Sequence, residues 1–151
     1  MSIFPKERAF NLHLGISPYY RGSGTNFWPF VNEELEFVGS TILHIDEGID
    51  TGDIVAHVRP DFERDDTVHS VGCKVIKNSV DVLIKLINKI SNDERINKIP
   101  QWETDINRYY KKDDFDINAL KNYKENLNKG LIDEYLDNKS SREKKAKIIS
   151  L

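Results

Sequence analysis

The spacing of the hydrophobic positions changes twice along this chain. Over residues 10–58 the apolar residues form short runs separated by Gly and Pro, which is typical of strands and loops. Residues 10–16 alternate apolar with polar or small side chains, which predicts a strand with one apolar face. Two more strands are predicted within residues 37–46 and 53–62, where β-branched residues are frequent.

Around Asp66 the apolar spacing lengthens to three and four residues. This period predicts an amphipathic helix whose apolar stripe packs on the sheet. Asp65, Asp66 and Thr67 are the residue types that cap a helix at its N-terminus, so they mark its start. The stripe consists of Val68, Val71, Val75, Ile76, Leu83, Ile84, Ile87 and Ile90.

After residue 92 the chain becomes rich in Lys, Asn and Asp. Asp116 is expected to cap a helix that ends near Gly130, and a shorter helix is predicted over residues 131–136. From Asn138 onwards we expect either a frayed end or a docking tail. The pattern therefore predicts an α/β chain with a helical C-terminal extension over residues 93–151.

Composition and charge narrow the class of protein. The chain has 151 residues and a net charge of −3, which disfavours a protein held to nucleic acid mainly by phosphate contacts. Its start carries no apolar signal region, and its apolar runs are far shorter than the roughly 20 residues of a membrane span. Cys73 is the single cysteine, so no disulfide framework is expected. We expect a soluble, cytoplasmic, one-domain chain.

Two polar residues lie on the first predicted strand, at positions where apolar core residues would be usual. Asn11 and His13 share one face, because side chains alternate along a strand. That face is either simply solvent-exposed, or it opens into a cleft of the kind found where strands of α/β sheets end.

The stretch HIDEGIDTGD, residues 44–53, is a second unusual feature. Its spacing does not match a calcium-binding loop, which leaves a solvated acidic turn or a loop that presents Asp50 to a neighbouring imidazole. His44 lies on a strand that could neighbour His13, whereas His57 and His69 are interpreted as surface or helix-start residues. No ligand spacing supports a metal site.

These segments, NLH…PYYRG followed by GSTILHIDEGIDTGDIV, together resemble the folate-dependent formyltransferase family. Members of this family modify initiator methionyl-tRNA, glycinamide ribonucleotide or nucleotide-linked amino sugars. The resemblance covers roughly residues 10–90. It implies a partial doubly wound sheet with a long amphipathic helix, and a catalytic half-domain over residues 1–92.

The resemblance also implies roles for particular residues. Asn11, His13 and Asp50 would be the catalytic residues of formyl transfer from 10-formyltetrahydrofolate to an amine, without a metal. The pterin end of the donor would lie against Ile45, Asp46, Glu47, Gly48 and Ile49. The acceptor would contact Tyr20, Arg21, Gly22 and Asn26.

The chain departs from the family pattern in two places. Leu14 and Gly15 stand where the family commonly has Pro and Ser, and residues 25–30 look more like the amino-sugar branch. Residues 1–9 stand where family members have a substantial length of sheet, so we expect either a fragment or a naturally short chain. A homodimer or a missing N-terminal half would then cover the open sheet edge. The alternatives are a formyltetrahydrofolate hydrolase and a non-catalytic, partner-binding remnant.

Overall fold

A three-stranded sheet lies at the centre of the fold. The computed structural model describes residues 8–151. Strands β1 (Phe10–His13), β3 (Ser40–His44) and β4 (Ile54–Val58) confirm the three predicted strands. They pair in the order β1-β3-β4, and both pairs are antiparallel. The confirmed α/β class thus comes with an antiparallel sheet in the described residues, whereas a doubly wound sheet is mostly parallel.

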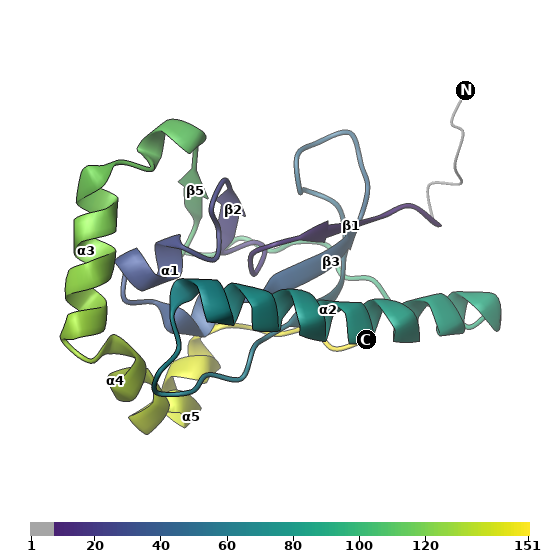
Figure 1. The fold of residues 1–151 in the computed structure, drawn as a ribbon. Helices are drawn as coiled ribbons and strands as arrows, with labels where there is room; N and C mark the ends of the chain where they lie inside the picture. The colour runs from purple at the N-terminus through teal and green to yellow at the C-terminus, as the bar shows by residue number, and fades with distance from the viewer. Residues whose placement is uncertain (1–7) are drawn as a thin grey trace.

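One face of this sheet is covered by the long helix α2 (Val68–Ser91), as the apolar stripe predicts. Figure 1 shows α2 running beside β1 and β3 over most of the width of the molecule. The helix begins where its capping residues indicate, because the Thr67 side chain accepts a hydrogen bond from the Ser70 N–H in a capping box. Ile42 and Val55 of the sheet pack against Leu86 of this helix.

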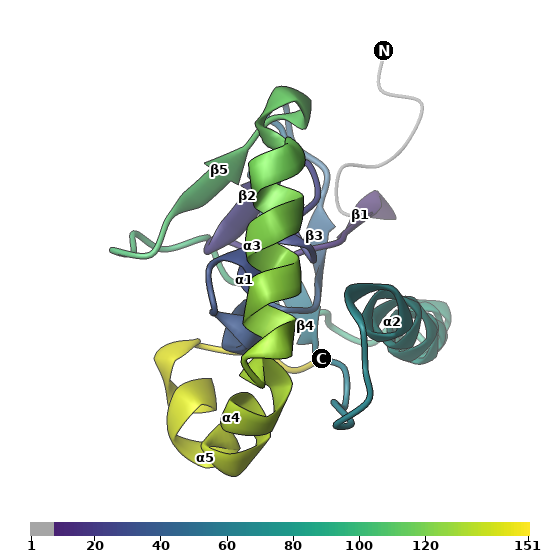
Figure 2. The same ribbon diagram turned by 60° about the vertical axis from the view of Figure 1, so that its left-hand side comes forward.

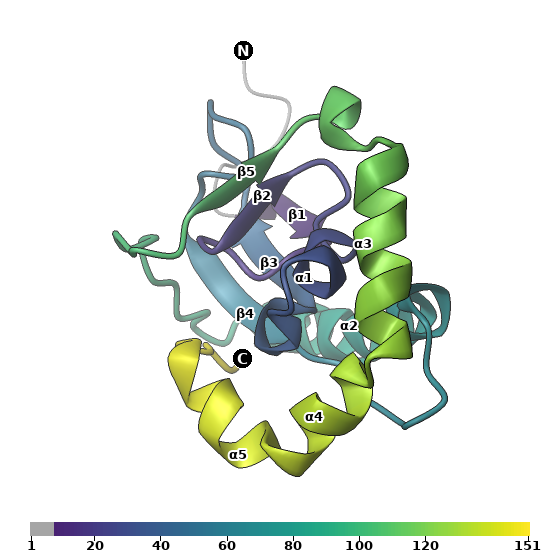
Figure 3. The ribbon, with the colours of Figure 1, turned by 90° about the vertical axis from the view of Figure 1, so that its left-hand side faces the viewer.

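A second layer covers the opposite face of the sheet (Figure 2). It contains a short parallel pair, β2 (Tyr20–Gly22) with β5 (Arg108–Tyr110), and the helices α1 (Trp28–Val31) and α3 (Ile117–Asn128). Figure 3 shows β5 next to β2, with α3 running along the same side. The parallel pair and α1 were not predicted, because both depend on contacts between distant parts of the chain.

The remaining helices close the lower end of the molecule in Figure 3. They are α4 (Leu131–Asp137) and α5 (Lys139–Arg142), followed by a short 3-10 turn at Glu143–Lys145. Two further 3-10 turns, Leu35–Phe37 and Lys112–Asp114, precede β3 and α3. Asp116 caps α3 by accepting from the Ala119 N–H at 2.8 Å, as predicted. Within residues 8–151 no helix is long and apolar enough to cross a membrane.

The two parts predicted over residues 1–92 and 93–151 share their cores. One apolar cluster joins Phe30 and Val75 to Tyr135, and another joins Trp28 to Ala146. The residues after 138 are therefore docked on the molecule and not frayed. The extension is helical with one added strand, β5, and the boundary at residue 92 remains a prediction.

Candidate active site

The polar face of β1 and the acidic loop of residues 45–53 meet in the structure. The Asn11 amide Nδ2 donates to Asp50 Oδ1 at 2.7 Å. The second oxygen, Asp50 Oδ2, lies 3.2 Å from His13 Nδ1. His13 is only 6% exposed and the Asp50 side chain 15%, so the three groups contact one another largely out of solvent. The structure thus brings together the three residues that the resemblance selected.

Hydrogen bonds within the acidic loop of residues 45–53 hold it in a shape in which Asp50 faces β1. The Asp46 carboxylate accepts from Thr51 Oγ1 at 2.8 and 2.9 Å and from the Gly48 N–H at 3.0 Å, which ties the loop to itself. Asp50 itself has a backbone φ of +55°, in the left-handed region that residues other than Gly rarely adopt. Non-glycine residues in this conformation cluster at functional sites, where the surrounding structure holds them.

A second contact fixes the ring of His13. Its Nε2 lies 3.1 Å from the carbonyl oxygen of Tyr20. Both ring nitrogens therefore face acceptor oxygens, and a neutral imidazole has one N–H to donate. Gly15 packs directly against this ring, because a Cβ added there would lie 2.7 Å from Nε2 and 2.8 Å from Cβ of Thr25.

A hollow of about 320 Å³ adjoins Asn11 and Asp50. Two isoleucines on its wall, Ile45 and Ile49, are 52% and 76% exposed, although large apolar side chains usually avoid water. Four of the five predicted donor contacts line this hollow, and the exposed Glu47 does not. The lining residues are Asn11, Leu43, His44, Ile45, Asp46, Gly48, Ile49 and Asp50.

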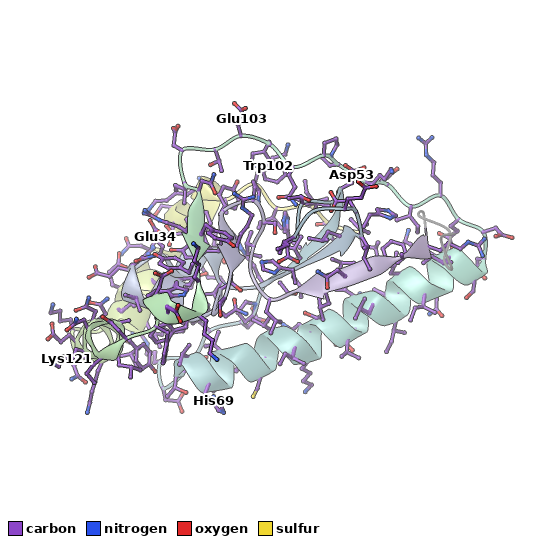
Figure 4. The ribbon with its side chains drawn as sticks, turned by 90° about the horizontal axis from the view of Figure 1, so that it is seen from above. Glu34, Asp53, His69, Trp102, Glu103 and Lys121 are labelled. Carbon is purple, nitrogen blue, oxygen red and sulfur yellow. The ribbon has the colours of Figure 1, made fainter. Side chains whose placement is uncertain are left out.

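A larger hollow of about 820 Å³ begins at Thr51, next to Asp50 in the chain. Arg21, one of the predicted acceptor contacts, lines it and donates to Asn107 Oδ1 at 3.0 Å. Gln101 and Trp102, which lie far along the chain from Arg21, also line this hollow. Figure 4 shows Trp102 and Asp53 on the same side of the molecule, above the sheet.

The other predicted acceptor contacts have structural partners. The Tyr20 ring is fully buried and its hydroxyl donates to Glu34, so the part of Tyr20 that faces the site is its carbonyl. Burial raises the pKa of Tyr20 far above its usual value. Burial also pushes the pKa of Glu34 upwards, but hydrogen bonds from Arg108 and Tyr20 outweigh it and lower that pKa.

Gly22 and Asn26 shape the connection between β1 and β3. Gly22 has φ +90° and approaches Tyr110 so closely that a Cβ would meet its carbonyl oxygen at 2.1 Å. Asn26 Oδ1 accepts from the Gly39 N–H at 2.9 Å and so ties this loop to the start of β3. These two residues hold the backbone near Arg21 in place.

The interpretation of His57 as a surface residue is wrong. His57 is 6% exposed, because α2 and the second layer cover both faces of β4. The Ile149 N–H donates to His57 Nδ1 at 3.0 Å, which leaves Nε2 as the protonated nitrogen, 2.8 Å from the Ser17 carbonyl. Burial lowers the pKa of His57 to about 4. His44 does lie on the strand next to β1, but opposite Phe10, with 4.7 Å between the ring centroids.

Sequence reasoning missed Gln101. Its side chain contacts the backbone of the Asp50 loop from a segment that has no hydrophobic period to signal it. Among the residues that the structure describes, no group of three or more His, Cys, Asp or Glu side chains is placed to hold a metal ion.

Comparisons with known proteins show the family to which the chain belongs. Residues 3–87 match the model of the formyl transferase family. The methionyl-tRNA formyltransferase of Clostridium acetobutylicum is 32% identical over 76% of this chain and 37% of its own length. That of Flavobacterium psychrophilum is 29% identical over 84% of this chain and 41% of its own length.

Solved structures of sugar formyltransferases have the same fold. The formyltransferase PseJ from Anoxybacillus kamchatkensis, in complex with a UDP-linked formamido sugar and tetrahydrofolate, matches with a TM-score of 0.62 and 29% identity. That alignment covers 72% of this chain and 55% of PseJ. The N-formyltransferase of Helicobacter canadensis, in complex with folinic acid and dTDP-3-aminofucose, has a TM-score of 0.62 and 30% identity over 73% of this chain and 40% of its own.

The extent of these matches is uneven. The chain spans about a third of the length of the curated relatives it matches, from 28% to 41%. The family model nevertheless covers more than half of this chain, including Asn11, His13 and Asp50. On these grounds the chain is a member of the formyl transferase family.

Proposed function

We propose that this chain transfers a formyl group from 10-formyltetrahydrofolate to the amine of a nucleotide-linked amino sugar. The observation that carries the proposal is the convergence of Asn11, His13 and Asp50. These groups match the needs of acyl transfer, in which a tetrahedral oxyanion forms as the amine attacks the formyl carbon.

Asn11 is the candidate donor to that oxyanion. Its amide nitrogen carries two hydrogens, and the contact with Asp50 uses one of them. The carboxylate therefore orients the amide while the second N–H stays free for the developing charge. A donor fixed before the reaction stabilises the transition state without reorganising during it.

His13 and Asp50 are the candidate groups for proton transfer. The 3.2 Å contact lets the carboxylate orient the imidazole and stabilise a positive charge on it. The pair can then take the proton that the attacking amine loses. The reaction needs no covalent intermediate on the protein.

The hollow next to Asn11 supports a folate donor. Its exposed Ile45 and Ile49 side chains offer an apolar wall for a flat heterocycle, and the loop backbone offers hydrogen-bonding groups at its edge. At about 320 Å³ it has room for the pterin end of the donor and not for its whole length. PseJ and the Helicobacter canadensis enzyme were both solved with folates.

The amino-sugar acceptor is supported by the structural neighbours and by the large hollow beside Thr51. PseJ is complexed with a UDP-linked sugar and the Helicobacter canadensis enzyme with dTDP-3-aminofucose. Arg21 at the edge of the large hollow would attract the negative charge of such a nucleotide. The curated relatives act on methionyl-tRNA, so that acceptor is the comparison to test. A homodimer remains a prediction.

The test supplies 10-formyltetrahydrofolate to this chain together with dTDP-3-aminofucose, methionyl-tRNA or water alone. Formamide product is measured by mass spectrometry, and formate is measured in parallel. We expect formylated sugar, and about a 100- to 1,000-fold lower rate for Asn11→Ala and for His13→Ala. His69→Ala is the control, because His69 is exposed and outside the site.

Three outcomes would overturn the proposal in different ways. Full activity of His13→Ala would remove the catalytic role of the three groups. Formate without formamide would indicate the hydrolase. No turnover and no saturable folate binding in calorimetry would indicate a remnant that binds a partner.

A further inference from the structure

Gln101 contacts the loop that carries Asp50, although it lies outside the segment that matches the family model. Its side-chain Nε2 donates to the carbonyl oxygen of Asp50 at 2.7 Å and to that of Gly52 at 3.1 Å. One amide group thus binds the backbone on both sides of Thr51. The carboxylate of Asp50 points the other way, to Asn11 and His13.

The backbone of this loop needs an outside partner to hold its shape. Asp50 has a left-handed φ of +55°, which costs a non-glycine residue on the order of 1–3 kcal/mol. Gly52 passes so close to the strand that an added Cβ would lie 1.8 Å from the His44 carbonyl oxygen. The hydrogen bonds of Asp46 bind the Gly48 N–H and the Thr51 hydroxyl, and not the carbonyl oxygens of Asp50 and Gly52. Gln101 is a half-buried partner from outside the loop, and it binds the carbonyl oxygen of the strained residue itself.

Gln101 is itself held firmly on both sides. Two residues before it, Ile99 pairs with Ile54 through hydrogen bonds of 2.8 and 2.9 Å. One residue after it, the ring of Trp102 packs against Tyr19 and lies under Lys147, whose Nζ is 4.4 Å from the ring centroid. The amide is therefore presented to the loop from a fixed segment.

We propose that Gln101 is a positioning residue that fixes the loop backbone and so aims the Asp50 carboxylate at Asn11 and His13. This inference rests on the proposed function, because the catalytic role of Asp50 is part of that proposal. A carboxamide suits the task, since it offers N–H groups to two carbonyl oxygens. A carboxylate in its place would set negative charge against both of those oxygens.

The sharpest test is Gln101→Glu, which keeps the shape and reverses the hydrogen-bonding character. We expect kcat to fall about 10- to 100-fold, as small misplacements of a catalytic group do. KM for the acceptor is measured in parallel, because Gln101 also lines the hollow beside Thr51. Gln101→Ala serves as a second variant, should Gln101→Glu fail to fold. Asn97→Asp is the control, because it makes the same change from amide to carboxylate at an exposed residue of the same segment.

A second readout needs no turnover. The ring ¹⁵N shifts of His13 report which nitrogen carries the proton, and they depend on the Asp50 carboxylate next to Nδ1. We expect these shifts to change in Gln101→Glu and in Gln101→Ala, and to stay as in the natural chain in Asn97→Asp.

The two readouts separate the two proposals. Unchanged His13 shifts together with unchanged kcat in both Gln101 variants would overturn the role of Gln101. Altered shifts in a chain that forms no formamide would support the positioning by Gln101 and overturn only the proposed function.

Discussion

At the residue scale, the candidate site is a closed set of polar contacts between one carboxylate, one amide and one imidazole. Asp50 accepts from Asn11 and faces His13, and Tyr20 accepts at the far side of the ring. Because these contacts hold the three side chains, the side chains are oriented before any ligand arrives. Preorganisation of this kind is where catalytic sites obtain most of their electrostatic stabilisation.

Gly15 is the residue whose replacement should disturb this arrangement most directly without touching its chemistry. Gly15→Ala would place a methyl group 2.7 Å from His13 Nε2 at a φ of +151°, where an L residue is strained. We expect at least a 10-fold loss of formyl transfer and a loss of roughly 1–2 kcal/mol in the free energy of unfolding. The measurements are initial rates and urea denaturation.

Gly72→Ala is the matched control for this prediction. Gly72 lies within α2 with no atom within 4 Å of an added Cβ. The same substitution there should stabilise the chain by about 0.5–1 kcal/mol, because alanine favours a helix. Equal effects at the two glycines would contradict the role of Gly15.

The sequence predicted some of these residues and missed others for definable reasons. Alternation along β1 puts Asn11 and His13 on one face, but the local pattern left that face and the acidic turn open to a solvent-exposed reading, and the family resemblance selected Asp50. His57 was misread because its burial depends on the tail around Ile149, which lies far away in the chain. Gln101 carries no local signal, since its partners come only with the folded loop.

At the element scale, the long helices followed from local rules and the small elements did not. Helices α2 and α3 begin at Thr67 and Asp116, whose side chains cap them as their residue types indicate. Strand β5 consists of three residues that pair with β2 from far along the chain. No pattern within so short a strand specifies its partner, so the pairing of β5 with β2 is known only from the structure.

The contact between β4 and the C-terminal tail should make stability depend on pH. The pKa of His57 is about 4 in the folded chain, against about 6.5 for an unperturbed histidine. Between these values the unfolded chain binds a proton that the folded chain does not. Stability is therefore complete above about pH 6.5 and is lost as the pH falls towards 4, by up to about 3 kcal/mol.

Urea denaturation between pH 4 and pH 7.5 measures this dependence. His57→Asn should flatten that part of the profile, because asparagine does not titrate. His69→Asn should retain it, since His69 is exposed. A profile that stays steep in His57→Asn would assign the dependence to other groups.

At the scale of the whole molecule, a buried ion pair ties the C-terminal helices to the sheet side. Arg142 is 8% exposed and donates through Nη2 to Glu36, 1% exposed, at 2.7 Å. Lys145 adds a contact of 3.0 Å to the same carboxylate. The extension is thus fastened by charge as well as by its apolar contacts.

Removing one partner of this pair should cost far more than removing an exposed ion pair. Arg142→Ala leaves the Glu36 carboxylate buried and is expected to lower the free energy of unfolding by roughly 3 kcal/mol. Arg64→Ala is the matched control, because Arg64 pairs with Asp133 and Asp137 at the exposed surface. Its loss should cost much less, because solvent screens an exposed ion pair.

Urea denaturation of both variants in one buffer makes the comparison. Similar losses for the two arginines would show that the burial of Arg142 adds nothing to its contribution to the free energy of unfolding.

The connection from β3 to β4 is anchored at two points. Where it leaves the sheet, the His44 N–H donates to the Asp53 carbonyl oxygen at 2.9 Å. In its middle, Asp50 accepts a hydrogen bond from Asn11 of β1. Surface loops ordinarily accept insertions at small entropic expense. Here an inserted or deleted residue would turn the carboxylate away from its partners. Under the proposed function, changes of length that adapt the molecule to a bulkier amine therefore belong on the Arg21 side, so that recognition of the acceptor could diverge without moving Asp50.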